Sequence, residues 1–155
     1  QSARGAFKLP SAEHERVVTM INGGVAQDDW PLQDQRAMME ASAELFPPEP
    51  DVQADSILAG DVPADWVTVP ASESGRVVLY LHGGGYSIGS LTSHRPFVAQ
   101  LARRSGMRAL SVDYRLAPEH PFPAAIEDCH AALRWLHDHA DSLGIDPERI
   151  AVGAV

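Results

Sequence analysis

Three consecutive glycines, Gly83 to Gly85, are the strongest candidates in this sequence for a direct part in a chemical reaction. They lie in segment 82–86, HGGGY, which follows the apolar run 76–81, RVVLYL, a pattern typical of a buried strand. Glycine is costly in ordered structure, so three in a row indicate a backbone requirement. Without Cβ atoms, the backbone can approach a ligand closely and direct its N–H groups at a tetrahedral oxyanion. Taken alone, the segment is also compatible with a flexible turn.

Phosphate-binding motifs do not fit these glycines. Gly84 and Gly89 frame a G-x-x-x-x-G pattern, but Ser90 stands where a P-loop needs lysine. No register gives G-x-G-x-x-G, because Tyr86 or Ile88 occupies a required glycine. The spacing therefore favours backbone donors to an oxyanion over a phosphate cradle.

The remaining candidate residues do not form a metal site. His137 and His139 are two positions apart in a predicted helix and point to different sides of it. The sequence has no H-E-x-x-H motif and no second cysteine, so we expect no metal. Cys129 falls on the apolar face of the same helix, where packing is expected rather than reactivity. His120 is expected to be structural.

The elements that would position the glycines alternate between strands and helices. Apolar runs predict strands at 66–69, 76–81, 107–112 and 149–155. Apolar residues at three- and four-residue spacing predict helices at 13–21, 31–46, 92–105 and 123–143. This order predicts an α/β fold with a mostly parallel sheet flanked by helices. Ligands bind at the carboxyl ends of such strands, where HGGGY lies.

Two predicted helices carry apolar faces and end at glycine. The helix at 92–105 is expected to end at Gly106 and to bury Phe97, Val98, Leu101 and Ala102. The helix at 123–143 is expected to end at Gly144 and to bury Ile126, Cys129, Leu133, Leu136 and Ala140. These faces should cover the sheet.

The segment 47–50, PPEP, is the boundary signal in the chain, because proline stops the preceding helix. We expect a helical segment over residues 1–50 and a sheet domain over residues 51–155. The chain begins at Gln1 rather than Met, which leaves a removed targeting segment open.

Composition excludes several kinds of partner. The net charge of −9 argues against a nucleic-acid binder, which needs clustered Lys and Arg. No apolar run reaches the ~18 residues that cross a bilayer, and the N-terminus has no signal-peptide pattern. A single cysteine excludes an internal disulfide framework and favours a reducing compartment. We therefore expect a cytoplasmic protein with no membrane or nucleic-acid partner.

Three motifs together resemble the bacterial hormone-sensitive-lipase family of esterases. HGGG at 82–85 matches the oxyanion motif of lipases and esterases. Residues 113–125, DYRLAPEHPFPAA, are similar to the family's DYRLAPE-x-x-FPAA signature, and residues 144–152, GIDPERIAV, to the segment before its nucleophile strand. The resemblance runs from about Val62 to Val155, with the motifs in the same order.

The resemblance implies an α/β-hydrolase fold in which residues 1–50 form an N-terminal helical cap over the acyl pocket. It implies no metal or organic cofactor. The oxyanion hole would use the amide of Gly84, with Gly83 or Gly85 as its partner, and a third donor from the residue after a serine.

Further residues of the motifs would support this loop. His82, Asp113, Tyr114 and Arg115 are expected to brace it, with Asp113 and Arg115 close enough for charge-assisted hydrogen bonds to neighbouring backbone. Tyr86 is expected either to face the substrate pocket or to pack on the surface.

The family's register places a nucleophilic serine immediately after Val155, so the chain is expected to be truncated before the nucleophile elbow. Ala154 stands where the usual G-x-S-x-G has its first glycine, which departs from the pattern. This segment would then require the C-terminal half of its own chain. A modified serine, a cleavage or a chosen boundary would each explain the end at Val155.

The function that the resemblance implies is hydrolysis of carboxylic esters with short to medium acyl chains. A Ser-His-Asp triad beyond this segment would act with the HGGG oxyanion hole on a small-molecule ester. The alternatives are a non-catalytic small-molecule receptor of the same fold and an amide or lactone hydrolase. A homodimer is left open.

Overall fold

The structure is a computed structural model that describes residues 11–23 and 30–155. It divides into two compact units, Gln1–Pro31 and Leu32–Val155. The first unit contains helix α1 (Ala12–Gly23), which confirms the helix predicted at 13–21. Residues 1–10 and 24–29 of the predicted 1–50 segment lie outside the described residues. The division at residue 50 stays a prediction.

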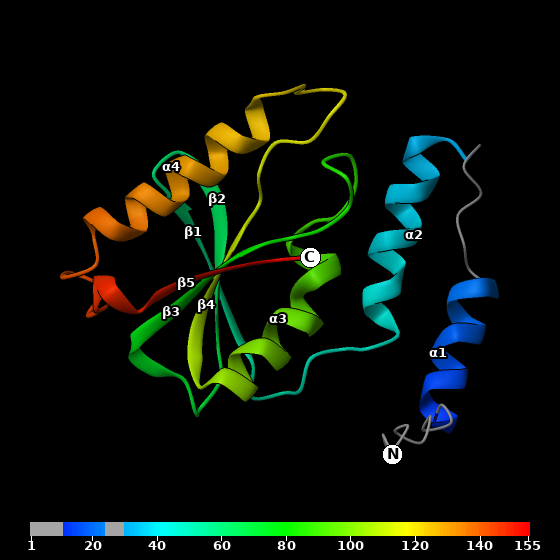
Figure 1. Ribbon diagram of the computed structural model, residues 1–155, viewed down its shortest axis with the longest axis horizontal. Coiled ribbons are helices and arrows are strands. Elements are labelled where there is room, and N and C mark those ends of the chain that lie inside the picture. Colours follow the sequence, from blue (N-terminus) through cyan, green and yellow to red (C-terminus); the bar gives the residue numbers. More distant parts are fainter. Residues whose placement is uncertain (1–10, 24–29) are drawn as a thin grey trace, which may run out of the picture. The chain divides into compact units, whose positions relative to one another are not determined.

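The second unit is built on a five-stranded sheet in the order β1-β2-β4-β3-β5 (Figure 1). The strands are β1 (Gln53–Ala59), β2 (Val62–Thr68), β3 (Glu73–Leu81), β4 (Met107–Val112) and β5 (Ile150–Ala154). β3 pairs in parallel with both β4 and β5, whereas β1, β2 and β4 pair antiparallel. The sheet is therefore mixed, with the predicted parallel strands at its centre and one edge.

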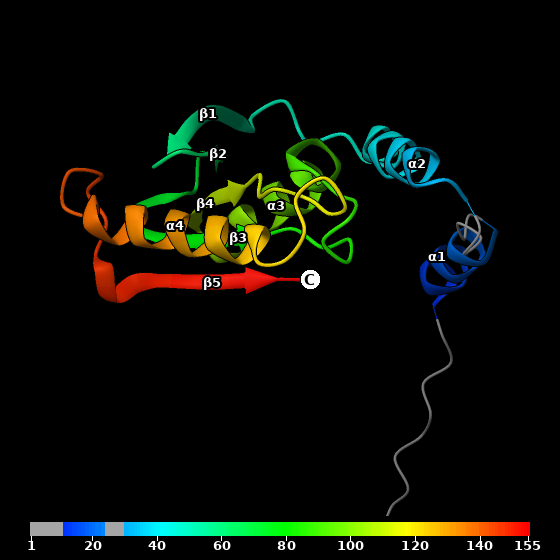
Figure 2. The same cartoon turned by 90° about the horizontal axis from the view of Figure 1, so that it is seen from above.

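Strand β1 was not predicted from the sequence. It pairs with β2 through the full register from Gln53 opposite Thr68 to Ala59 opposite Val62. Most of its residues are exposed, because it lies at the edge of the sheet opposite β5 (Figure 2). An exposed edge strand shows little of the apolar alternation that reveals a strand in a sequence.

Helices cover both faces of the sheet (Figure 1). Helix α4 (Ala124–Asp138) packs Ala125, Ala132 and Leu136 into a cluster that contains residues of β1, β2 and β4 together with Val77 and Leu79 of β3. Helix α3 (Leu91–Ser105) packs Val98, Ala99 and Ala102 against the opposite face. Two cores therefore hold β3 between two helices, which gives the loop after β3 a rigid base.

The predicted helix at 92–105 is confirmed, with one error in its buried face. Ser90 caps its N-terminus with a capping box, and Gly106 ends it in the left-handed region at φ 67°. Phe97 is 50% exposed, against the prediction that it is buried. Its ring lies at the flank of the helix, 5.6 Å from the ring of Tyr80, because Val98 and Ala99 face the sheet.

The predicted helix at 123–143 is regular only as far as Asp138 and continues as turns to Gly144, which has φ 66°. Ile126 is 51% exposed, against the prediction that it is buried. The helix is rotated so that Ala125 takes the buried position, and Ile126 is left facing a cavity at the end of the sheet.

Helix α2 (Leu32–Glu44) confirms the helix predicted at 31–46. It belongs to the unit of the sheet and contacts α3. The hydroxyl of Ser90, the N-cap of α3, donates to the carboxylate of Glu40 at 2.5 Å. α2 is thus attached to the turn that follows the glycine loop.

Candidate active site

Three segments meet at the carboxyl ends of the parallel strands. Leu81 ends β3 and is paired with Val112 of β4 on one side and Ala154 of β5 on the other. The glycine loop, the Asp113 segment and Val155 therefore leave the sheet side by side. This is the edge where open α/β sheets bind ligands, and it is the edge at which the sequence analysis placed the HGGGY segment.

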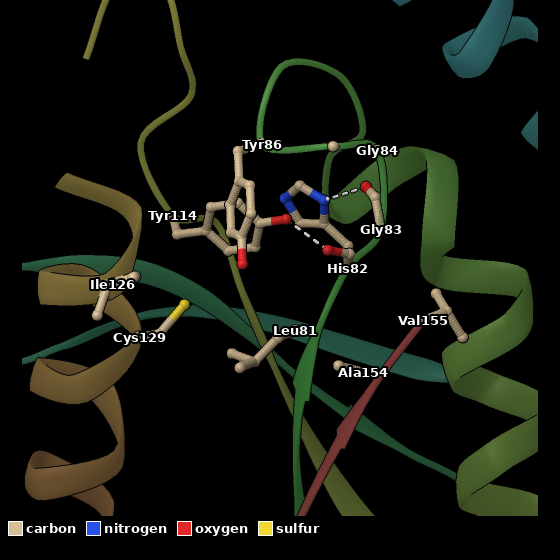
Figure 3. Close-up of a pocket in the computed structure, with 11 residues that line it drawn as sticks. Leu81, His82, Gly83, Gly84, Tyr86, Tyr114, Ile126, Cys129, Ala154 and Val155 are labelled. Carbon is tan, nitrogen blue, oxygen red and sulfur yellow. Dashed lines mark hydrogen bonds between the residues drawn. The ribbon is translucent and has the colours of Figure 1, made fainter. Parts of the chain in front are cut away.

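A cavity of about 350 Å³ lies at this edge (Figure 3). Its lining is mostly apolar and consists of Leu81, His82, Gly83, Gly84, Gly85, Tyr86, Tyr114, Ile126, Cys129, Ala154 and Val155. The three predicted oxyanion glycines and Tyr86 thus share one cavity with the end of β5. Ile126 and Cys129 project into it from α4 (Figure 3).

The glycine loop approaches its neighbours too closely for side chains. A Cβ at Gly84, whose φ is 122°, would lie 2.1 Å from the carbonyl oxygen of Ile88. A Cβ at Gly83 would lie 2.9 Å from the carbonyl oxygen of Val155. By contrast, a Cβ at Gly85 would meet nothing within 4 Å, although its φ of 59° is left-handed. The first two glycines are therefore required by close packing, the third only by its backbone angle.

The turn after Gly84 leaves backbone donors unused. The amides of Ser87 and Ile88 both donate to the carbonyl of Gly84 at 3.1 Å, which closes the turn. Within the described part of the chain, none of the amides of Gly83, Gly84 and Gly85 donates a hydrogen bond to another residue. The three N–H groups at the cavity are thus available to an acceptor.

His82 contacts the glycine loop through its ring. Its Nδ1 is 2.9 Å from the carbonyl oxygen of Gly83, so the ring holds the loop as a donor at that nitrogen (Figure 3). Its Nε2 is buried and has no partner among the described residues. Burial lowers the pKa of the ring, against opposing contributions from the Gly83 carbonyl and Glu40, which favours the neutral form.

Tyr114 supports His82 in two ways. Its ring stacks on the imidazole with centroids 4.2 Å apart and planes 12° apart. Its hydroxyl donates to the carbonyl of His82 (Figure 3). Burial, with smaller contributions from Cys129, Tyr86 and Tyr80, raises the pKa of Tyr114 to about 12, so the phenol stays a donor at neutral pH.

The carboxylate partner of Arg115 is Asp128 of α4, not Asp113. The Arg115 guanidinium donates to both Asp128 oxygens at 2.8–3.1 Å, and its backbone amide adds a bond of 2.9 Å. Asp113 is exposed, and its pKa is raised by partial desolvation and by the carboxylates of Asp65 and Glu40. Arg115 thus fastens the segment after β4 to helix α4, and the described residues show no hydrogen bond between the side chains of Asp113 and Arg115.

Tyr86 combines the two positions that the sequence left open. It lines the cavity but keeps 58% of its surface exposed. Its backbone has φ 61°, a conformation that is uncommon for a residue with a side chain. The ring of Tyr114 lies 6.3 Å from its own. The surrounding contacts must therefore hold this strained residue in place.

Arg36 of α2 is a site residue that the sequence reasoning missed. Its guanidinium donates to the carbonyls of Ser87 and Ala117 and to both carboxylate oxygens of Glu119. The bond with Arg36 lowers the pKa of Glu119 to about 2. These partners are 51 to 83 positions away along the chain, and no local spacing indicates them.

The remaining candidate residues lie beside the cavity or on the surface. Cys129 is half-buried beside the cavity, and burial raises the pKa of its thiol to about 11. His120, His137 and His139 are exposed, and His139 stacks on the ring of Trp135. No group of three or more potential metal ligands occurs in residues 11–23 and 30–155.

The sheet, the helices on its faces and the glycine loop define a chain of the α/β-hydrolase fold. A family model described as alpha/beta hydrolase fold matches residues 78–153. A crystal structure titled as an esterase from the bacterial hormone-sensitive lipase family superposes with a TM-score of 0.85 and 43% identity, covering 95% of this chain and 48% of that one. The chain belongs to the hormone-sensitive-lipase family of α/β hydrolases.

Curated relatives agree with this assignment. A carboxylic ester hydrolase, LipN, of Mycobacterium tuberculosis is 39% identical over 84% of this chain and 36% of its own length. The carboxylesterase NlhH of the same organism is 55% identical over 49% of this chain and 24% of its own. An acetyl-hydrolase of Streptomyces hygroscopicus is 35% identical over 93% of this chain and 46% of its own length. The chain thus spans less than half the length of each of these relatives.

None of the described helices combines the length and the apolar character that are needed to cross a membrane.

Proposed function

We propose that this chain supplies the oxyanion-binding part of a serine hydrolase that cleaves carboxylic esters. Relatives named as a carboxylic ester hydrolase, a carboxylesterase and an acetyl-hydrolase support the reaction class. The observation that carries the proposal is the free amides of Gly83 and Gly84 beside the end of β5. In the complete protein, a serine would follow Val155, and an Asp and a His would come later.

The mechanism follows from where charge develops. The serine hydroxyl, deprotonated by the histidine, attacks the ester carbonyl, whose oxygen becomes negative in the tetrahedral intermediate. The Gly83 and Gly84 amides receive that charge, and the turn that holds them is closed in advance by the bonds from the Ser87 and Ile88 amides to the Gly84 carbonyl. The alcohol departs, and water then hydrolyses the acyl-enzyme.

Gly83 fits the second oxyanion donor better than Gly85. A Cβ added to Gly83 would lie 2.9 Å from the Val155 carbonyl oxygen, so this glycine is close to where the next residue would begin. Gly85 lies further along the turn, and a Cβ added to it would have no atom within 4 Å. The donor pair proposed here is therefore Gly83 and Gly84, with the residue after the serine as the third.

The cavity supports short to medium acyl chains. Its volume is about 350 Å³, and Ile126 and Cys129 of α4 form an apolar wall opposite the glycines. A hydrocarbon chain would be stabilised there by leaving water, whereas a long chain would extend beyond the cavity. The helices of residues 1–50 would serve as the cap over this pocket.

The test uses the full-length protein and nitrophenyl esters of graded acyl length. We expect turnover that falls with long chains, a burst equal to the enzyme concentration, and no activity when the serine after Val155 is replaced by alanine. Absence of both burst and turnover with every ester would refute the proposal. Ligand binding without turnover would then favour a non-catalytic receptor. Turnover of anilides or lactones, but of no ester in the panel, would favour an amide or lactone hydrolase.

A further inference from the structure

Arg36 joins the two loops that carry the site motifs. Its Nε donates to the carbonyl of Ser87 at 2.8 Å, and its Nη2 donates to the carbonyl of Ala117 at 3.0 Å. Ser87 follows the glycines after β3, and Ala117 lies in the segment after β4. Only 22% of the Arg36 side chain is exposed. A side chain from α2, a helix outside the sheet, therefore reaches both loops.

Glu119 holds the guanidinium in the orientation that these bonds need. Its two carboxylate oxygens lie 2.7 Å from Nη1 and 2.8 Å from Nη2 of Arg36, a bidentate arrangement. Such a pair fixes the plane of the guanidinium, because both nitrogens must meet their oxygens at once. The remaining Nε–H is then directed at Ser87. Lysine has no equivalent geometry.

The contacts of Arg36 complete a closed ring of hydrogen bonds through the strained residue. The amide of Ala117 donates to the carbonyl of Tyr86 at 2.8 Å, while its own carbonyl accepts from Arg36. Tyr86 precedes Ser87, whose carbonyl accepts from Arg36 and whose amide donates to Gly84. The Tyr86 carbonyl and both backbone groups of Ser87 are thereby held in place.

We infer that Arg36 is a positioning residue for the oxyanion hole, acting through Ser87 and Tyr86 on the Gly84 turn. The expected loss of kcat rests on the proposed function, whereas the expected loosening of the Gly84 turn does not. Arg36 itself does not line the cavity. Its loss would let the turn relax, and misplacing the donors weakens transition-state binding more than substrate binding.

The kinetic test compares Arg36→Met with Arg103→Met in the full-length protein. Arg103 is a matched control, because it forms a bidentate pair with Asp51 at 2.6 and 3.1 Å but contacts neither loop. For Arg36→Met we expect kcat to fall by roughly 10- to 100-fold with KM changed less than about 3-fold. Arg103→Met should leave both constants at wild-type values. A raised KM with unchanged kcat, or equal losses in both variants, would overturn the inference.

A second measurement separates this inference from the proposed activity. Hydrogen–deuterium exchange of residues 82–89 should become about 10-fold faster or more in Arg36→Met and stay unchanged in Arg103→Met. This outcome is expected even if the wild-type protein hydrolyses no ester, a result that would refute only the proposed function. Unchanged exchange in Arg36→Met would refute the positioning role.

Arg36→Lys serves if Arg36→Met does not fold. Lysine keeps the charge near Glu119 but cannot bind the carboxylate and both carbonyls together. We expect an intermediate loss of kcat and intermediate exchange. Wild-type values in both measurements would show that charge alone suffices and would overturn the inference.

Discussion

Replacing Gly84 by alanine tests the central geometry of the site. The added Cβ would lie 2.1 Å from the Ile88 carbonyl oxygen and 2.6 Å from its carbonyl carbon. Both neighbours are backbone atoms of the same turn, so no flexible side chain can move aside. The φ of 122° adds strain that an alanine does not tolerate. The turn must therefore shift, and the Gly84 amide must shift with it.

The size of the effect follows from these distances. An ordinary contact to a Cβ begins near 3.4 Å, so the overlap is more than 1 Å. A displacement of about 1 Å at a reacting centre costs on the order of 100-fold in rate. Complete loss of one oxyanion donor costs about 10²–10³ in kcat, or about 2.7–4 kcal/mol. We therefore expect Gly84→Ala to lower kcat by about 100- to 1,000-fold.

Gly85→Ala provides the comparison within the same loop. Its Cβ would meet nothing within 4 Å, and the cost is that of a left-handed alanine at φ 59°, about 1–2 kcal/mol of stability. Steady-state kinetics with a short-chain nitrophenyl ester and thermal denaturation would be measured for both variants. The reasoning fails if Gly84→Ala keeps kcat within about 3-fold of wild type, or if Gly85→Ala loses as much activity.

Three further predictions concern supporting groups. Tyr114→Phe should lower the free energy of unfolding by about 1–3 kcal/mol in chemical denaturation, because the His82 carbonyl loses its buried donor; an unchanged midpoint would contradict this. The pKa of Glu119 is lowered from 4.5 to about 2, so its stabilising contribution is present above about pH 4.5 and is lost as pH falls toward 2. The difference in unfolding free energy between wild type and Glu119→Gln should therefore shrink over that pH range. A constant difference would refute the pairing of Glu119 with Arg36. With a thiol pKa of about 11, about one Cys129 in a thousand is ionised at pH 8, so a disulfide reagent should label it far more slowly in the native than in the denatured protein, and equal rates would contradict its burial.

The sequence by itself determined the elements whose signals are local. The strand at 107–112, the end of α3 at Gly106 and the glycine loop after β3 each depend on neighbouring residues. Apolar runs, cap residues and glycine's backbone freedom act over a few positions, so a single sequence contains them. The meeting of the loops at one sheet edge also followed, because parallel strands bring their carboxyl ends together.

Only the tertiary structure decided which side chains meet. Phe97 and Ile126 have apolar side chains at helical spacing, yet packing against the sheet placed a neighbouring residue of each helix in the core instead. Arg115 pairs with the carboxylate of Asp128 on α4, and Arg36 donates hydrogen bonds to two loops that are distant from it in the sequence. Helix rotation and ion pairing depend on surfaces that approach only when the chain folds, and no spacing along the chain encodes that approach.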